Sequence, residues 1–313
     1  MQAVVIDPHA PARLGFQTVE PPTPQANETV IRVKAISLNR GEVVYLTQGK
    51  PGTRLGWDLA GVVEQAAADG SGPAQGTRVV GISMAPPRAW AEQVAVPTNA
   101  LAELPPSVSF AQAAALPVAG LTALYAIEHG GSLIARSVLV TGASGGVGYF
   151  ACRLASLAGA QVVGQVRQSP SASLVQEAGA DHVVVDENIA AAAAFGPYHL
   201  IIDQLGGRTL AEAMTQLAPE GTCVSIGATA GHNVPFDLGR VRQAPGASLD
   251  FFNLFLEFRR EPASLGLQRL VRLVSTGKLL PPLGMEADWH EIGRVAQALI
   301  DRQFPGKAVL HIS

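Results

Sequence analysis

The glycine-rich stretch at residues 138–160, VLVTGASGGVGYFACRLASLAGA, constrains the fold of this chain most strongly. The β-branched run Val138–Val140 predicts a buried strand, and a helix of small residues is expected to begin at about Gly146. The turn between them holds Gly142, Gly145 and Gly148. Glycine lets the backbone turn sharply, approach a ligand closely and pack helix against strand. Because the helix start offers free N–H groups to an anion, the stretch predicts dinucleotide binding; a tight loop without a ligand is the alternative.

Length and composition favour a two-domain globular chain. The 313 residues are 48% hydrophobic and 15% charged, which suits packed cores and argues against disorder. A net charge of −3 provides no basic field for a nucleic-acid backbone, so nucleic acid is not an expected partner. Cys152 and Cys223 fall in an expected helix and an expected strand, which suits reduced packing residues better than a disulfide.

The sequence also predicts a cytoplasmic protein without a membrane segment. The N-terminus, MQAVVIDPHAPARLGF, lacks the basic region and the long apolar core of a signal peptide. The longest apolar stretch, Ala111–Ile127, is interrupted by Pro117 and Gly120 and falls short of a membrane span.

The first hundred residues consist of short β-branched runs separated by turns rich in proline and glycine. The expected strands are Ala3–Ile6, Thr29–Ala35, Leu59–Glu64, Arg78–Ile82 and Ala91–Val96. This spacing favours a compact, mostly antiparallel, barrel-like domain.

Strands and helices alternate after the glycine turn. The expected strands are Gln161–Val166, His182–Val185, Leu200–Asp203, Thr222–Ile226 and Ser248–Phe252, and the expected helices are Ser171–Ala178 and Arg208–Ala218. Such alternation is typical of a doubly wound parallel sheet.

Beyond Leu265 the pattern predicts a helix ending at Gly277, a proline-rich turn, a helix at Glu291–Arg302 and a terminal strand at Lys307–Ile312. That last strand has no sheet of its own to join. We therefore expect it to return to the N-terminal domain, which would make that domain discontinuous.

Eight short segments carry a resemblance to a known family. They are SLNRGE (Ser37–Glu42), GWDLAGVV (Gly56–Val63), GTRVVG (Gly76–Gly81), AALPVAGLTAL (Ala114–Leu124), VTGASGGVG (Val140–Gly148), GADHVV (Gly179–Val184), LIIDQLGG (Leu200–Gly207) and FPGKAVL (Phe304–Leu310). In this order they resemble the zinc-free quinone oxidoreductase-like branch of the medium-chain dehydrogenase/reductase superfamily, over essentially the whole chain.

The resemblance implies an α/β fold with two domains. A Rossmann doubly wound parallel sheet, expected at residues 116–260, would bind the dinucleotide. A discontinuous GroES-like, mostly antiparallel β-barrel, expected at residues 1–115 and 261–313, would form the substrate domain. In the family the site lies in the cleft between the two.

The resemblance also bears on zinc. Zinc-dependent relatives place a Cys in the stretch matched by Ser37–Arg40, a His-Glu pair at Trp57–Asp58 and a third ligand near Val118. Zn²⁺ requires a closed set of Cys, His or carboxylate ligands, or three such ligands and a water. This chain shows no such set and has two cysteines in total, so the sequence predicts chemistry without zinc.

The end of the second expected Rossmann strand indicates which nucleotide binds. An NAD-preferring site usually has Asp or Glu there, accepting from the ribose 2′-hydroxyl. Here Val166 takes that place and Arg167 follows it. A guanidinium binds a 2′-phosphate bidentately, whereas a carboxylate repels it, so NADPH is predicted ahead of NADH. Ser169 and Ser171 are expected to add hydroxyl donors, and an ordinary exposed arginine is the alternative for Arg167.

Other cofactor contacts are implied by the resemblance alone. Asn39 matches an Asn near the nicotinamide ribose, with turn capping as the alternative. Thr122 matches a Thr beside the nicotinamide or its phosphate, and Gly227 matches a backbone contact under the nicotinamide. Lys307 is expected to close the cleft over the cofactor. The pyrophosphate loop is matched by Ser144, Gly145, Gly146 and Val147.

The predicted chemistry is metal-free hydride transfer to an apolar quinone or α,β-unsaturated carbonyl. Such a substrate spreads the developing charge as a quinol anion or enolate, so alignment and one hydrogen-bond donor suffice. Relatives carry a Tyr in the segment after the matched Asn, which makes Tyr45 the predicted donor, with Val44 as the neighbouring register. Asn39 is the second residue placed at the reaction centre, and Arg40 is a further candidate for contacting substrate or a cofactor phosphate.

An aromatic segment, DFFNLFLEFRR (Asp250–Arg260), is the predicted pocket wall. In relatives this region edges the cleft and pairs subunits through the last Rossmann strand. The resemblance therefore implies that Phe251, Phe252 and Phe255 line the substrate pocket or a homodimer contact. Ordinary core packing is the alternative.

Three functions stay open at this stage. The leading one is an NADPH-dependent reductase of quinones or activated alkenes. The second is an enoyl-thioester reductase, which would need a longer channel with a basic lip; no concentrated basic run supports it. The third is a nucleotide-binding regulatory or structural protein without turnover, which damage to the glycine turn or to Asn39 would indicate, and neither is damaged.

Overall fold

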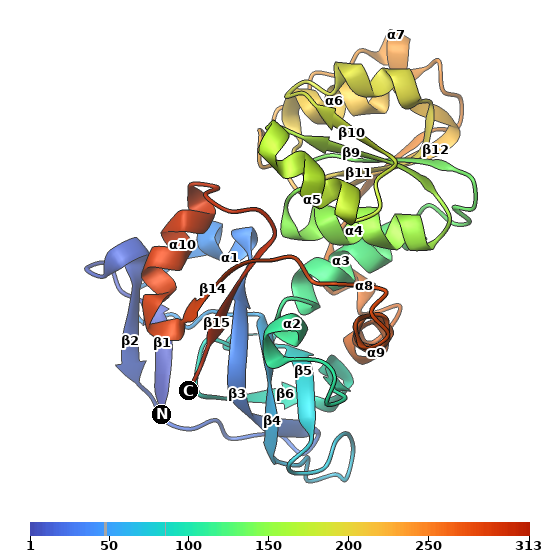
Figure 1. The fold of residues 1–313 in the computed structure, drawn as a ribbon. Helices are drawn as coiled ribbons and strands as arrows, with labels where there is room; N and C mark the ends of the chain where they lie inside the picture. The colour runs from blue at the N-terminus through green and yellow to red at the C-terminus, as the bar shows by residue number, and fades with distance from the viewer. Residues whose placement is uncertain (47–48, 85) are drawn as a thin grey trace. The chain divides into compact units, whose positions relative to one another are not determined.

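The computed structural model describes residues 1–46, 49–84 and 86–313, without the side chains of residues 44–46. It divides into two compact units (Figure 1). Unit 1 comprises Met1–Leu121 and Phe255–Ser313, and unit 2 comprises Thr122–Leu254. Unit 1 is therefore built from both ends of the chain.

Unit 2 is a Rossmann-like α/β unit around a parallel sheet. Its strand order is β10-β9-β8-β11-β12-β13, so the order reverses at β8. Figure 1 shows α6 on one side of this sheet and α4 on the other. The strands are β8 (Ser137–Val140), β9 (Gln161–Val166), β10 (His182–Val185), β11 (Tyr198–Asp203), β12 (Leu217–Ser225) and β13 (Ser248–Phe251). The helices are α3 (Pro117–Glu128, which begins in unit 1), α4 (Gly146–Leu157), α5 (Ala172–Glu177), α6 (Gly207–Met214) and α7 (Leu238–Val241), with 3₁₀ turns at Ser169–Ser171 and Ala190–Phe195.

The core of unit 2 explains why its strands are near-continuous apolar runs. Helices cover both faces of a parallel sheet, so both sets of alternating side chains are buried. Leu139, Ile201 and Cys223 come from three neighbouring strands, and each has no exposed surface. Cys152 and Cys223 are free and buried, as the sequence predicted.

Unit 1 is a GroES-like, mostly antiparallel unit. Its main sheet has the order β14-β15-β3-β4-β5-β7, β6 also pairs with β3, and β1 pairs with β2. The strands are β1 (Gln2–Ile6), β2 (Leu14–Thr18), β3 (Glu28–Leu38), β4 (Asp58–Gln65), β5 (Arg78–Ile82), β6 (Gln93–Pro97), β7 (Leu101–Glu103), β14 (Leu283–Asp288) and β15 (Lys307–His311). The helices are α1 (Arg40–Leu46), α2 (Phe110–Ala114), α8 (Leu254–Glu257, which begins in unit 2), α9 (Ala263–Ser275) and α10 (Ile292–Ile300), with 3₁₀ turns at Pro11–Arg13, Thr98–Ala100 and Trp289–Glu291.

The C-terminal strand does return to the N-terminal sheet. β15 pairs antiparallel with β3, with Val309 opposite Ser37, and parallel with β14. The sequence missed β14, because its residues follow a Pro-Pro pair and were expected to be a turn. The expected helix over Arg208–Ala218 was also too long: α6 ends at Met214, and β12 begins at Leu217 to pair with β11.

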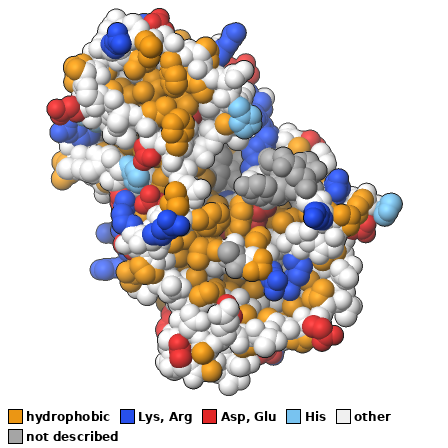
Figure 2. All heavy atoms as spheres, turned by 180° about the vertical axis from the view of Figure 1, so that it is seen from behind, with side chains coloured by type: hydrophobic (Ala, Val, Ile, Leu, Met, Phe, Trp, Pro, Cys, Tyr) orange, Lys and Arg blue, Asp and Glu red, His pale blue; other side chains and the backbone are white. Residues whose placement is uncertain are grey.

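Among the described residues, no helix combines the length and the apolarity needed to cross a membrane. Unit 2 exposes several large apolar side chains, and Figure 2 shows apolar side chains gathered on one face of the upper body, which is this unit. Phe251, at the end of β13, is 76% exposed.

Candidate functional site: a glycine turn and a buried ionic cluster

The glycine turn of unit 2 has the geometry of an anion site. It joins β8 to α4, and Gly145 occupies the N-cap position without a side-chain capping bond. A Cβ on Gly148 would lie 2.4 Å from the carbonyl oxygen of Gly142, so only glycine fits where helix and turn approach. The residues from Ser144 to Val147 are partly exposed. The first backbone N–H groups of a 12-residue helix therefore lie at a turn that a ligand can reach.

Two glutamines hold the Gly142 end of this turn, one from each of the strands that flank β8. Gln165, at 2% exposure on β9, accepts a 2.9 Å hydrogen bond from the Gly142 N–H through Oε1. Gln204, just after β11, donates from Nε2 to the Thr141 carbonyl oxygen at 2.7 Å. Sequence reasoning missed both residues, because an isolated Gln at a strand end carries no recognisable signal.

Asp203 fixes the neighbouring turn. Its Oδ1 accepts from the Thr141 hydroxyl at 2.8 Å, and its Oδ2 accepts from the Gly206 N–H at 2.9 Å. Burial raises the pKa of this carboxyl, and the N–H and hydroxyl donors oppose that shift. Asp203 therefore couples the ends of β8 and β11, where a doubly wound sheet places its ligand.

Three residues predicted to contact the cofactor follow strands of the unit 2 sheet. Arg167 is exposed directly after β9, Ser171 is partly buried at the start of α5, and Gly227 follows β12. Since these strands are parallel, their carboxyl ends meet at the edge that carries the glycine turn. Thr122, on α3, is 4% exposed. No bound ligand tests these assignments, and they stay predictions.

Unit 1 contains a buried ionic cluster of five polar side chains. They are Ser37 at the end of β3, Asn39 before α1, Glu42 on α1, Asp58 at the start of β4 and Lys307 at the start of β15. Each of the five is at most 8% exposed. The antiparallel register of β3 with β4 and with β15 brings these side chains together, because Ser37 lies opposite both Asp58 and Val309.

Asp58 is the centre of this cluster. Its Oδ2 accepts from the Ser37 hydroxyl at 2.5 Å and from Asn39 Nδ2 at 2.8 Å. Its Oδ1 accepts from the backbone N–H of Val118 at 2.9 Å. Lys307 Nζ completes the set at 3.2 Å from Oδ2. The carboxylate, which has no exposed surface, is thus fully hydrogen-bonded.

Lys307 corrects one expectation. Its ammonium is buried and donates to the Leu38 carbonyl, to Asn39 Oδ1 and to Asp58 Oδ2. All three N–H groups are used inside unit 1, so the side chain is not placed to close over a cofactor. Lysine is seldom fully buried without a charged partner, and here Asp58 is that partner.

Glu42 adds a second carboxyl to the cluster. Burial and then the charge of Asp58 raise its pKa to about 8, while Lys307 lowers it. Its Oε1 accepts from the Trp57 N–H at 2.6 Å, and its Oε2 accepts from the Asn39 N–H at 2.8 Å. Asn39 stands directly before α1, and its side-chain amide bonds to Glu42, Asp58 and Lys307.

The aromatic segment divides between the units. Phe255 lies in unit 1, and its ring centroid is 5.6 Å from that of Trp57, which itself packs over Gly41 on α1. Phe251 and Phe252 lie in unit 2, so the structure does not bring the three phenylalanines together in one unit.

Two further candidates lie on α1. Tyr45 falls on this helix, but its side chain is outside the described part of the chain. Arg40 is partly buried, and burial followed by the like charge of Arg302 lowers its pKa. Arg40 directly follows Asn39, so the like charge of Arg302 acts on the first residue of α1.

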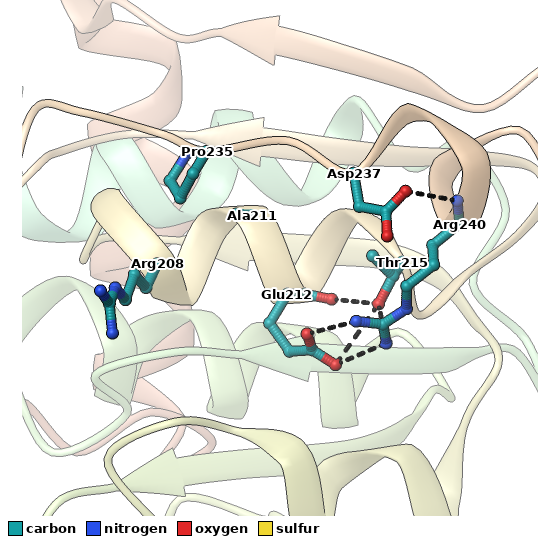
Figure 3. Close-up of a pocket in the computed structure, with 7 residues that line it drawn as sticks. All are labelled: Arg208, Ala211, Glu212, Thr215, Pro235, Asp237 and Arg240. Carbon is teal, nitrogen blue, oxygen red and sulfur yellow. Dashed lines mark hydrogen bonds and ion pairs between the residues drawn. The ribbon is translucent and has the colours of Figure 1, made fainter.

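A separate hollow of about 360 Å³ lies on unit 2 between α6 and the segment leading to α7 (Figure 3). Figure 3 shows Glu212 and Arg240 turned toward each other across it, and they are paired at 2.8 Å and 2.9 Å. Arg240 also donates to the Thr215 hydroxyl at 3.0 Å. The charged groups at this end of the hollow thus bond to one another, and none of the predicted site residues lines it.

The fold defines a class: a two-domain α/β protein with a Rossmann-like unit and a discontinuous GroES-like unit. Comparisons with known proteins agree. The zinc-binding dehydrogenase family model matches residues 146–249, and the alcohol dehydrogenase GroES-like domain model matches residues 25–106.

Among characterised relatives, the chain is similar to a quinone oxidoreductase of Pseudomonas aeruginosa, with 29% identity over 74% of this chain and 75% of the relative. It is 23% identical to an acryloyl-coenzyme A reductase of Metallosphaera sedula, over 99% of each chain. A mycobacterial protein solved in complex with NADPH superposes with a TM-score of 0.88 at 25% identity, and the match covers 100% of both chains. The chain belongs to the medium-chain dehydrogenase/reductase superfamily, in its quinone oxidoreductase-like branch.

One of the two matched family models describes zinc-binding dehydrogenases, which raises the question whether the ionic cluster around Asp58 could hold zinc. The stretches matched with zinc ligands converge on Asp58, whose two oxygens already accept hydrogen bonds. An ammonium lies 3.2 Å from it, where a second cation would be repelled. Nowhere in the described ranges do three or more His, Cys, Asp or Glu residues gather as a metal site. The donor set of this cluster does not fit Zn²⁺.

Proposed function

We propose that this chain is an NADPH-dependent oxidoreductase that transfers hydride to a quinone or an α,β-unsaturated carbonyl without a metal. The observation that carries the proposal is the uncapped glycine turn with Arg167 exposed at the end of β9, where an acid would favour NADH. The NADPH complex of a structural neighbour and the named activities of the relatives support it.

Each unit supplies residues with a distinct task. In unit 2, the N–H groups after Gly145 would bind the diphosphate, and Arg167 with Ser171 would bind the 2′-phosphate. Gln165 and Gln204 hold the turn in this shape before the ligand arrives. In unit 1, Asn39 would contact the nicotinamide ribose, and the arginine pair on and near α1 would add positive charge.

NADPH, when bound, supplies the hydride. What the chain must supply is alignment and a donor for the substrate oxygen, because a quinone or enone spreads the resulting charge itself. Tyr45 remains the proposed donor. Trp57 and Phe255 present aromatic surface in unit 1 beside the cluster, which suits a flat, apolar acceptor.

An enoyl-thioester reductase is the second candidate, favoured by the full-length similarity to an acryloyl-coenzyme A reductase. The two candidates differ only in the acceptor. A panel holding benzoquinones, simple enones and acryloyl-coenzyme A separates them by their kcat/KM values. A protein that binds NADPH but turns over none of these acceptors would be a nucleotide-binding regulator instead.

The test of the cofactor assignment is a titration of Arg167→Asp with NADPH and with NADH. We expect the Kd for NADPH to rise about 10- to 100-fold, the equivalent of one charge-assisted pair lost, with little change for NADH. Arg242→Asp, at another exposed arginine of unit 2, is the matched control. Equal effects of Arg167→Asp on both nucleotides would remove the case for 2′-phosphate binding.

We also propose a homodimer paired through β13. This strand ends the described sheet order, pairs there with β12 and leaves Phe251 76% exposed. An exposed strand edge with an apolar side chain is suited to pairing with a second copy. Light scattering should give a dimer for the wild type and for Leu280→Lys, an exposed site in unit 1, and a monomer for Phe251→Lys. A monomeric wild type refutes this assembly.

A further inference from the structure

The Asn39 side chain has almost no unused hydrogen-bonding capacity. A side-chain amide offers two N–H donors and two acceptor lone pairs. Nδ2 donates to Asp58 Oδ2 at 2.8 Å and to Glu42 Oε2 at 3.1 Å, so both donors are taken. Oδ1 accepts from Lys307 Nζ at 2.5 Å. One lone pair on Oδ1 is all that is left for a ligand.

Lys307 sets which way this amide faces. An ammonium only donates hydrogen bonds, and an ionised carboxylate only accepts them. Flipping the amide would place its NH₂ against Lys307 and its oxygen against Asp58, two repulsive contacts inside a buried site. Lys307 is itself fixed, because its remaining N–H groups bond to the Leu38 carbonyl and to Asp58.

We propose that Lys307 is a positioning residue that makes Asn39 a hydrogen-bond acceptor toward the bound cofactor. Asn39 Oδ1 then accepts a hydrogen bond from a hydroxyl of the nicotinamide ribose, and the side chain does not donate to the substrate oxygen that becomes negative. The inference rests on the proposed function and deepens it, since it removes Asn39 from the candidates for stabilising that charge. Lys307, at the start of β15, thereby determines which atom of the Asn39 amide, on the connection from β3 to α1, is available to a ligand.

The experiment compares NADPH with analogues lacking the 2′- or the 3′-hydroxyl of the nicotinamide ribose, by fluorescence titration. The wild type should bind at least one analogue about tenfold more weakly than NADPH. Asn39→Ala and Lys307→Met should each abolish that discrimination, and Lys307→Arg should restore part of it, because a guanidinium is also a pure donor. Lys278→Met, an exposed lysine, is the control and should behave as the wild type.

If Lys307→Met does not fold, the double variant Lys307→Met/Asp58→Asn replaces it, because that variant leaves no unpaired cation or central carboxylate behind. A folded variant without Lys307 that still discriminates the analogues as the wild type does would overturn the inference. A wild type that binds neither NADPH nor NADH would overturn the proposed function instead.

A measurement without ligand tests the positioning contact in either case. The melting temperatures of the wild type, Asn39→Ala, Lys307→Met and Asn39→Ala/Lys307→Met form a cycle. We expect the double variant to lose less than the sum of the two single losses, because both remove one contact. Additive losses would show that Lys307 does not hold Asn39.

Discussion

Replacing Asp58 by Asn should destabilise unit 1 by about 3–5 kcal/mol, the range for breaking a buried ion pair on one side. The substitution changes one atom and keeps the shape of the side chain. It removes the negative charge that faces Lys307 at 3.2 Å, where both groups are at most 4% exposed. The large effect therefore comes from charge and hydrogen-bond polarity rather than from packing.

The hydrogen bonds account for part of this magnitude. Three donors, from Ser37, Asn39 and Lys307, converge on Oδ2, so the amide oxygen of the variant should take that place. Its NH₂ group then meets the Val118 N–H, which now donates to Oδ1 at 2.9 Å. An unsatisfied buried donor costs about 1–3 kcal/mol. The remainder is the cost of a buried ammonium without its carboxylate.

Tryptophan fluorescence isolates the relevant unit, because Trp57, Trp90 and Trp289 all lie in unit 1. Urea unfolding at pH 7 followed by this signal should show the loss for Asp58→Asn, whereas Asp301→Asn, an exposed acid, should change the free energy of unfolding by less than about 0.5 kcal/mol. A loss below about 1 kcal/mol for Asp58→Asn would mean that Lys307 and Asp58 are not a buried pair, and the account of the cluster would be wrong.

Two further predictions concern Glu42 and the glycine turn. The pKa of Glu42 is raised from 4.5 to about 8, so between these pH values the folded chain keeps a proton that the unfolded chain releases. The free energy of unfolding of unit 1 should therefore fall as pH rises through this range, by at most about 5 kcal/mol. In urea unfolding at pH 5 to 9, Glu42→Gln should show a weaker dependence on pH than the wild type. Gly148→Ala should destabilise unit 2, because its Cβ meets backbone 2.4 Å away, which circular dichroism melting would detect. Gly145→Ala should fold normally, since its nearest neighbour is 3.4 Å from the new Cβ, yet bind NADPH more weakly; equal melting losses for both variants would contradict this account of the turn.

Local patterns were enough to predict most elements of unit 2. The strand, turn and helix around Gly146 follow from a β-branched run, three glycines and a small-residue helix, and the structure begins α4 at that residue. The later strands are apolar runs bounded by polar residues, and β9 and β10 have the predicted limits. Where tertiary pairing decided the outcome, the patterns were insufficient: β14 follows two prolines and exists as a strand because it pairs with β15.

The two glutamines that hold the glycine turn, Gln165 and Gln204, could not be predicted in the same way. Gln165 reads as one more residue of an apolar strand, and its function comes from reaching across to Gly142 on the neighbouring strand's turn. Sequence patterns give the face of a strand on which a side chain lies but not the atom it meets. The resemblance singled out Asn39 as a residue near the nicotinamide ribose, which stays a prediction, but it carried no information about which end of the amide would be free.

Lys307 shows where a stronger argument from sequence was available. Asp58 lies at a strand start in an otherwise apolar segment, and an acid is almost never buried without a partner. Such an acid therefore requires hydrogen-bond donors or a cation from elsewhere in the chain. β3 is central in its sheet, and the strand that pairs with it at Ser37 from the far end of the chain is β15, which begins with Lys307. Once the terminal strand was assigned to that sheet, its first residue was the natural partner. The resemblance implied instead that Lys307 closes the cleft over the cofactor, which left Asp58 without its cation.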